Sequence, residues 1–175
     1  YLYPHYRGGG DVRVAGNTVY DNTNNGIYLY VHNSYFNHNR YTIADNVVHD
    51  SGRGIYIDQD YSDVTVDVTG NEVYNSSEGI YFNMYHSYTV TALIADNDVH
   101  DNARGIYTYN NYRPTFNPIV TGNRVYNNTG EGMRFSTYNT QTSNVPDLSL
   151  NEVYGNGGTG IVCYATHAVN ILYND

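Results

Sequence analysis

The chain has 175 residues, which suits a single domain and is long enough to bury a hydrophobic core. Its 17 acidic and 8 basic residues give a formal net charge of -9, which argues against a nucleic-acid partner and against an anionic membrane surface, because both select for a basic face. All apolar runs stay below the roughly 18 residues needed to cross a bilayer, so no membrane insertion is expected.

One short pattern recurs along the whole chain. The segments "VAGNTVY", "IADNVVH", "VTGNEVY", "IADNDVH", "VTGNRVY" and "LSLNEVY" place an asparagine at the same position in each copy, with steps of 29, 25, 26, 26 and 28 residues. A glycine follows each asparagine after eight or nine residues. A fixed period of this length predicts stacked repeats. The aligned residues are Asn17, Asn46, Asn71, Asn97, Asn123 and Asn151, followed by Gly26, Gly54, Gly79, Gly105, Gly132 and Gly160.

Apolar residues alternate with polar residues or tyrosines on both sides of each asparagine and after each glycine, which predicts short strands with one buried face. One such unit cannot bury its own apolar face, whereas stacked units form a continuous interior. The predicted inward columns are Val14, Ile43, Val68, Ile94, Val120 and Leu148; Val19, Val48, Val73, Val99, Val125 and Val153; and the two inward residues after each glycine, from Ile27 and Leu29 to Ile161 and Cys163.

The aligned asparagines are expected to form a ladder, because amides repeated at about 4.8 Å can hydrogen-bond up and down a stack. Asparagine also tolerates the left-handed backbone that a corner of a coil demands. We therefore predict that the aligned asparagines occupy one left-handed corner and the aligned glycines the next.

Strands of the form "GIxLx" followed by "IxxNxVxxN" resemble the repeat of right-handed parallel β-helix proteins, the pectate-lyase-like and NosD-like solenoids, over essentially the whole chain. The resemblance implies an all-β, right-handed parallel β-helix that forms one domain over residues 1–175. With a repeat of about 26 residues, we expect six to seven coils. The group includes lyases, hydrolases, epimerases, adhesins and plain surface proteins, so the fold does not fix the function.

Tyrosine occurs 22 times, and a row of tyrosines lines the outward side of the strands after the glycines. Rings stacked at strand spacing stabilise a parallel sheet, and exposed flat rings also hold sugars, so a structural role and a glycan-binding role both fit. Longer connections that follow these strands are expected on the same side and would add to a binding face. The candidate ligand-binding residues are Tyr28, Tyr30, Tyr56, Tyr81, Tyr107, Tyr109 and Arg134.

A histidine, an aspartate and an arginine recur together as His49, Asp50 and Arg53 and again as His100, Asp101 and Arg104. A polysaccharide lyase or epimerase needs a base beside a carboxylate and a cation that neutralises it. A catalyst is usually a single break in a period, however, and residues copied between coils are more typical of a scaffold. The candidate catalytic residues are therefore the weakly supported His49, Arg53, His100 and Arg104.

An acidic cluster, Asp58, Asp60, Asp63 and Asp67, interrupts the period after the second copy. Clustered carboxylates on a loop are calcium ligands in some proteins, but this spacing matches no calcium loop known to us, and solvated acids are the default in an acidic chain. We therefore name Asp58, Asp60 and Asp63 as weak metal candidates and expect no cofactor other than calcium.

The sequence favours a non-enzymatic, extracellular or cell-surface β-solenoid with a structural or adhesive role. The alternative is a carbohydrate-active enzyme, such as a polysaccharide lyase, hydrolase or epimerase, or a glycan-binding fragment of one. Asn75 and Asn127 begin sequons that would be glycosylated only in a secreted protein whose source glycosylates asparagine.

Residues 1–3 match 28–30 and residues 170–173 match 151–154, so the chain begins and ends inside coils. One subunit's end could continue the next subunit's coil, which would form a head-to-tail filament; the alternative is that the sequence is a piece of a longer rod. The expected partners are thus further copies of the chain or a polysaccharide.

Overall fold

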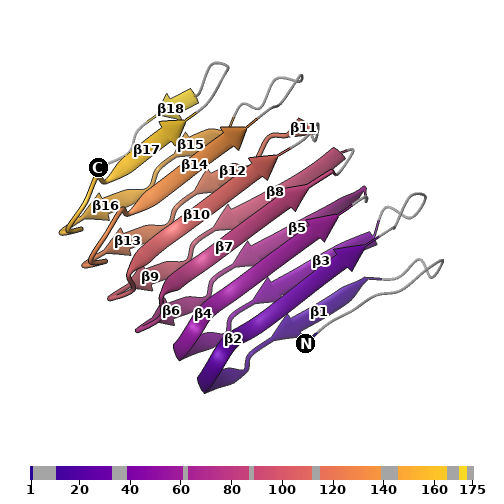
Figure 1. Cartoon of the computed structure of the whole chain (residues 1–175), viewed down its shortest axis with the longest axis horizontal. Coiled ribbons are helices and arrows are strands. Elements are labelled where there is room, and N and C mark those ends of the chain that lie inside the picture. The colour runs from indigo at the N-terminus through magenta and orange to yellow at the C-terminus, as the bar shows by residue number, and fades with distance from the viewer. Residues whose placement is uncertain are drawn as a thin grey trace.

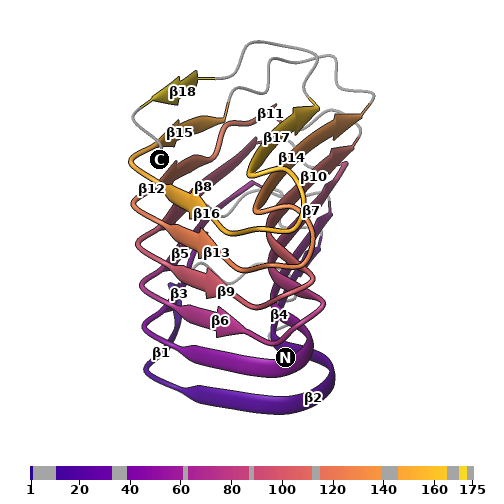
Figure 2. The same cartoon turned by 90° about the vertical axis from the view of Figure 1, so that its left-hand side faces the viewer.

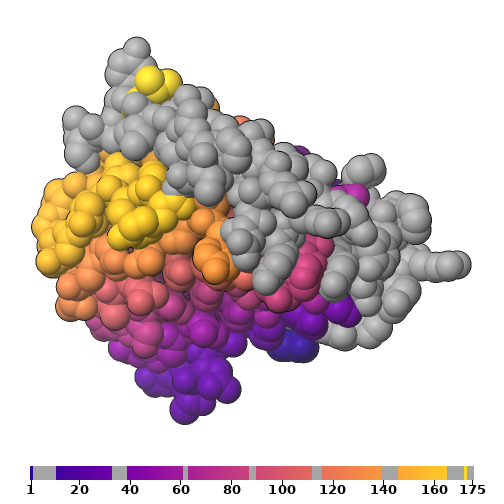
Figure 3. Space-filling model, turned by 45° about the horizontal axis from the view of Figure 1, so that its top comes forward, coloured from indigo at the N-terminus to yellow at the C-terminus, as the bar shows by residue number. Residues whose placement is uncertain are grey.

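The computed structural model describes residues 1, 11–32, 39–60, 63–86, 89–111, 115–138, 146–164 and 170–172. Every regular element there is a β-strand, and the strands wind into a stack of coils that rises from the N-terminal to the C-terminal part of the chain (Figures 1 and 2). In the space-filling view the colours follow one another in bands in the order of the chain (Figure 3). The expected all-β parallel solenoid is therefore confirmed.

One face of the stack is an eight-stranded parallel sheet formed mostly by the strands that lead into the aligned asparagines. Its last strand pairs Asn170 with Asp147 and not with Asn151, so the predicted match of residues 170–173 with 151–154 is wrong. In sheet order its strands are β1 (Val12–Ala15), β3 (Asn39–Ala44), β5 (Val64–Thr69), β8 (Thr89–Ala95), β12 (Ile119–Thr121), β15 (Asp147–Ser149) and β18 (Asn170–Leu172), and β11 (Thr115–Phe116) also pairs with β8.

The ten-stranded sheet covers the other two faces, because two of its strands, β2 (Thr18–His32) and β4 (Val47–Asp60), run around a corner. The first part of β4 pairs with β6, and its second part pairs with β7. The strands of the ten-stranded sheet, in chain order, are β2 (Thr18–His32), β4 (Val47–Asp60), β6 (Glu72–Tyr74), β7 (Glu78–Tyr85), β9 (Asp98–His100), β10 (Arg104–Asn111), β13 (Arg124–Tyr126), β14 (Met133–Tyr138), β16 (Glu152–Tyr154) and β17 (Ile161–Tyr164).

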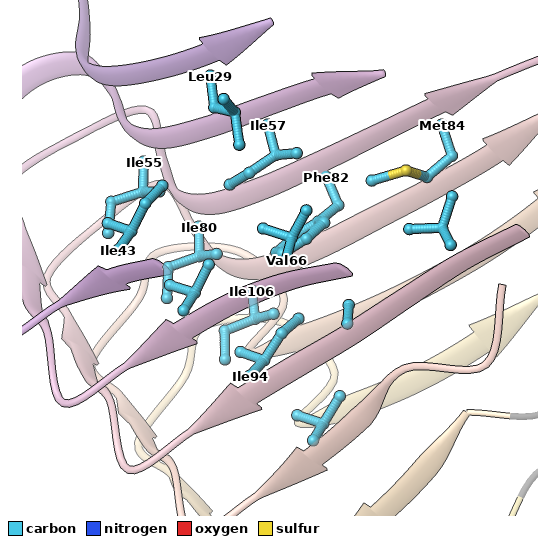
Figure 4. Packing of buried hydrophobic residues seen from close by; sticks show 14 of the residues in the cluster. Leu29, Ile43, Ile55, Ile57, Val66, Ile80, Phe82, Met84, Ile94 and Ile106 are labelled. Carbon is cyan, nitrogen blue, oxygen red and sulfur yellow. The ribbon is translucent and has the colours of Figure 1, made fainter. Parts of the chain in front are cut away.

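The core is one column that runs through all the coils. Figure 4 shows Ile57 and Phe82 pointing toward Val66 on the facing sheet. The predicted inward columns are buried or packed against this core, with the outermost members only partly covered. A further inward column, which the sequence pattern did not indicate, lies two residues later on the long strands and is formed by Val31, Gln59, Met84 and Asn110.

The aligned asparagines form the predicted ladder. Each backbone N–H and each side-chain Nδ2 donates to the Oδ1 atom of the asparagine in the next coil, over 2.8 to 3.1 Å. Five such steps join the six asparagines from Asn17 to Asn151. The described residues thus include about five complete turns, slightly fewer than the six to seven coils expected, because the flanking part-coils lie mostly outside them.

The prediction that the asparagines themselves take left-handed backbone is wrong. The left-handed residue stands one position earlier, with φ between 55° and 67° at Gly16, Asp45, Gly70, Asp96, Gly122 and Leu150. The asparagine is therefore selected for its amide and its ladder rather than for its backbone. A second left-handed corner falls four residues after each asparagine, at Asp21, Asp50, Asn75, Asp101, Asn127 and Gly155.

The aligned glycines are required for space rather than for left-handed backbone, so that prediction is also wrong. A Cβ atom on Gly54 would lie 2.3 Å from Cγ1 of Val73 and 2.6 Å from the carbonyl oxygen of Gly79. The other aligned glycines that have a coil stacked after them meet the same two kinds of neighbour. Each of these glycines thus lets a valine and the next backbone approach closely.

A second polar ladder was not predicted. The backbone N–H of Ser76 donates to Oδ1 of Asn102 over 2.9 Å, and Asn102 and Asn128 continue the pattern toward Asn156 over 3.0 Å. These side chains lie at the turn between the two parts of the ten-stranded sheet, and Ser76, Asn102 and Asn128 are buried. Both inner turns of each coil are therefore held by polar side chains that repeat along the stack.

Replacing Asn97 by Leu should destabilise the fold by about 3 kcal/mol, because it leaves the buried backbone N–H of Asn71 without its acceptor and removes the side-chain bonds that Asn97 makes to Asn71, Asn123 and the carbonyl oxygen of Val68. Urea denaturation measures the change, and Asn24→Leu at an exposed position of β2 is the control. Equal stability of the two variants would contradict a structural role for the ladder.

Replacing Leu150 by Gly should stabilise the protein by about 1 kcal/mol, because a non-glycine residue pays for left-handed backbone and Leu150 is 63% exposed at φ 57°. The control is Leu150→Ala, which removes the exposed apolar side chain but keeps the strained backbone. A rise in the melting temperature that is as large for alanine as for glycine would show that the gain comes from the side chain instead.

Candidate functional site

The outer side of the long strands carries the predicted row of tyrosines. The rings of Tyr28, Tyr56, Tyr81 and Tyr107 stack with centroids 4.8 to 5.1 Å apart and interplanar angles of 2 to 17°. We call this side of β2, β4, β7, β10, β14 and β17 the tyrosine face. Arg134 continues the row, with its guanidinium carbon 5.5 Å from the centre of the Tyr107 ring.

The stacked geometry limits how the tyrosine face can bind a sugar. Each inner ring has both of its faces covered by neighbouring rings, and Tyr56 is only 9% exposed. A sugar ring therefore cannot lie flat on Tyr56 or Tyr81 unless the stack opens. What the face offers outward is ring edges and hydroxyl groups.

The next outward row contains the remaining tyrosine candidates together with polar residues. Tyr30, Asp58, Asn83 and Tyr109 occupy equivalent positions on β2, β4, β7 and β10. Asp58 accepts hydrogen bonds from the Tyr28 hydroxyl at 3.1 Å and from Nδ2 of Asn83 at 2.9 Å. Both of its carboxylate oxygens are thus engaged by the face itself.

An alternating row of charges borders the tyrosine face where the long strands begin. Arg53 pairs with Glu78 at 2.7 Å, Glu78 with Arg104 at 3.4 Å, and Arg104 with Glu131 at 3.7 Å. We call these four residues the charge ladder. The guanidinium carbon of Arg53 also lies 4.5 Å from the centre of the Tyr56 ring. Arg53 and Arg104, two of the catalytic candidates, are therefore members of a structural row.

The other two catalytic candidates lie on a different face. His49 and His100 alternate with tyrosines in a second aromatic stack, whose centroids are 4.7 to 5.2 Å apart and whose members are Tyr20, His49, Tyr74, His100, Tyr126 and Tyr154. Nδ1 of His49 lies 2.6 Å from the carboxylate of Asp50, and Nδ1 of His100 lies 2.8 Å from that of Asp101. No contact joins either histidine to the arginine of its own copy in the described part of the chain.

The acidic cluster is divided between two sheets. Asp58 and Asp60 end β4, whereas Asp67 lies in β5, where it is buried and paired with Arg40. Asp63 stands just before β5. Within the described segments, no group of three His, Cys, Asp or Glu side chains is arranged to hold a metal ion. The geometry therefore gives the calcium alternative no support.

A cluster of three titratable side chains, which the sequence pattern did not indicate, occurs once and does not repeat. His32, Asp60 and His86 end three successive strands or follow them directly, and Nδ1 of His32 and Nδ1 of His86 lie 3.3 Å and 3.7 Å from the two oxygens of Asp60. Burial raises the pKa of the Asp60 carboxyl, and the two histidines partly oppose this shift. The register partners of Asp60 are His32 in the coil before it and Tyr85 in the coil after it, so the carboxylate does not repeat there and the cluster is a break in the period.

The two sequon asparagines, Asn75 and Asn127, are both exposed at left-handed corners.

No helix long and apolar enough to span a membrane occurs in the portion that the structure describes.

Burial in the tyrosine face predicts loss of stability in alkali. It raises the pKa of Tyr56 to about 12 and also raises the pKa of Tyr28 and Tyr81, so folding favours the protonated phenols. This contribution to the free energy of unfolding is fully present below the ordinary pKa of 10.0 and is lost as the pH rises toward 12. Urea denaturation at pH 9 and pH 11 measures it. Tyr56→Phe should weaken the pH dependence and the exposed Tyr138→Phe should not; equal effects would contradict this origin.

The comparisons with known proteins agree with this architecture. The model of the right-handed β-helix region matches residues 4–92 and, in a second match, residues 35–175. No curated protein and no solved structure matches the chain. The two matches together span nearly the whole sequence, in agreement with the coil-by-coil stacking described above. The chain therefore belongs to the right-handed β-helix family.

Proposed function

We propose that this chain is a non-enzymatic β-solenoid with a structural or adhesive role outside the cell or on its surface. The observation that carries the proposal is that side chains on its outer faces bind chiefly to their own counterparts in the next coil. The tyrosine face, the charge ladder and the histidine–tyrosine stack all follow this rule.

Such an arrangement suits a rigid rod. A side chain stacked between two copies of itself is held by dispersion and by its neighbours' charges, and it has little freedom to change its contacts during a reaction. The repeated groups named as catalytic candidates also lie in two separate rows. Ring edges, hydroxyl groups and the exposed sequons are consistent with contact to polysaccharides or to other copies of the chain at a cell surface.

The carbohydrate-active alternative now has one specific observation in its favour. His32, Asp60 and His86 form an unrepeated set in which a carboxylate lies between two imidazoles, and such a carboxylate can orient a histidine that acts as a base. If the chain were a lyase or a hydrolase, we would place its acid–base chemistry there rather than at His49 and His100.

A panel of acidic and neutral polysaccharides separates these functions. We expect no depolymerisation, measured as unsaturated products that absorb in the ultraviolet and as new reducing ends. Turnover that is lost in His32→Ala combined with His86→Ala, but kept in His49→Ala combined with His100→Ala, would overturn the proposal and support the alternative.

Retention on the same polysaccharides tests the adhesive part of the proposal. If the outward hydroxyl groups make the contact, Tyr81→Phe combined with Tyr107→Phe should abolish retention while the stacked rings keep the fold intact. Antibody labelling of intact source cells should find the chain on the surface or in the medium. A chain that labels only after the cells are opened would contradict the proposed location.

A further inference from the structure

A hollow of about 440 Å³ opens beside the first strands of the ten-stranded sheet, at the corner where β2 and β4 turn. It is lined by residues 23–25, Gly52, Arg53, Ser77 and Glu78, which come from three successive coils. Its lining is mostly polar, and its volume is within the usual range for sites that hold small molecules.

A bulge in β2 shapes this hollow. Between Asn22 and Asn25 the strand has one residue more than β4 has between Ser51 and Arg53. The extra length brings the bulge backbone over Gly52, where an added Cβ atom would lie 2.3 Å from the carbonyl oxygen of Asn24. Only glycine fits beneath the bulge, so the recess is built into the backbone and does not depend on side-chain rotamers.

The charge ladder ends at this hollow with one partner missing. Arg104 has a carboxylate on each side, Glu78 at 3.4 Å and Glu131 at 3.7 Å. Arg53 has Glu78 on one side, but its register partner on the other side is Asn25, an amide where the alternation would place an acid. The position next to Arg53 therefore lacks a negative charge.

Arg53 is fixed in place by two contacts that leave its two terminal nitrogens, Nη1 and Nη2, without a hydrogen-bond acceptor in the described residues. Its Nε donates to Glu78 at 2.7 Å, and its guanidinium lies over the Tyr56 ring. Among the described residues no acceptor binds its Nη1 or Nη2 atoms. Because the guanidinium is fixed on one edge and one face, its two remaining nitrogens form a preorganised fork of the kind that binds a carboxylate with two parallel hydrogen bonds.

Asn25 supplies the complementary group. Its Oδ1 atom is buried, yet no donor within the described segments reaches it. A buried amide oxygen without a donor is costly, and a turn of the Asn25 side chain toward the hollow, which it lines, would let a ligand hydroxyl donate to this oxygen and remove that cost. The hollow thus combines a fork of donors for an anion with an acceptor for a hydroxyl group.

We propose that this hollow binds a small hydroxycarboxylate. The ligand's carboxylate takes the place of the acid that is missing beside Arg53 and completes the charge ladder, and a hydroxyl group of the ligand donates to Oδ1 of Asn25. Glu78 does not repel the ligand strongly, because Arg53 and Arg104 both neutralise it. The site is independent of the polysaccharide contacts proposed for the tyrosine face.

Titration of ¹⁵N-labelled protein with sodium gluconate tests the proposal, with sorbitol as the neutral analogue and sodium chloride as the salt control. The amide signals of Gly52, Arg53 and Ser77 should shift saturably with gluconate and not with the controls. No saturable shift up to about 100 mM, well above the millimolar dissociation constants of weak sites, would overturn the proposal, as would equal shifts with sorbitol.

Three variants locate the site. Arg53→Gln should weaken gluconate binding at least about tenfold, whereas Arg124→Gln, which makes the same charge change on another face, should leave it unchanged. Asn25→Glu should abolish binding while keeping the dispersed spectrum of a folded chain, because its own carboxylate then pairs with Arg53. Gluconate binding that survives Asn25→Glu would overturn the proposal even if Arg53→Gln fails to fold.

Discussion

The asparagine ladder sets the constraint on which the rest of the molecule depends. Each asparagine binds the next coil through its backbone N–H and its side-chain amide at once, so neither the spacing nor the register of the coils can change without breaking two buried hydrogen bonds. Once the register is fixed there, every other residue faces the residue one repeat away. Valine packs on valine, tyrosine stacks on tyrosine, and arginine meets glutamate as a direct result.

The same stacking explains why the repeat has a finer period of two coils. At the left-handed corner before the asparagine, Oδ1 of Asp45 lies 2.8 Å from where a Cβ atom of Gly70 would be, and Asp96 stands in the same relation to Gly122. A side chain in one coil occupies the space of the next, so an acid must be followed by glycine. The alternation of "IADN" with "VTGN" is therefore a packing requirement.

The features that were predicted correctly from the sequence are those that the repeat period determines. The inward position of Ile57, the ladder at Asn97 and the outward row at Tyr81 all follow from alternation and repeat spacing. The assignment of left-handed backbone to the asparagines was wrong. A repeated residue in the sequence shows which position is constant, but it does not show whether the backbone or the side chain of that residue is the reason. The cluster of Asp60 with His32 and His86 was missed because these residues occupy three different repeats, and only the lengths and register of the strands bring them together. Asp67 was grouped with Asp60 for the opposite reason: they are close in the chain but lie in different sheets.

In a solenoid of this kind, polar groups with unused hydrogen bonds or charges occur where the repeat is broken. A repeated polar group finds its partner in the next coil, so its hydrogen bonds and charges are already used, as at Glu78. A polar group whose partner in the next coil is replaced by another residue type keeps hydrogen-bonding or charge-pairing capacity that the protein does not use. Asn25 stands where the alternation would place an acid and leaves the fork of Arg53 open, whereas Tyr85 follows Asp60 in its row, so the carboxylate of the imidazole–carboxylate cluster is not repeated in the next coil. The hollow beside Arg53 and the cluster around Asp60 are therefore found by asking which ladders stop, since the polar groups of ladders that continue are already bound within the protein.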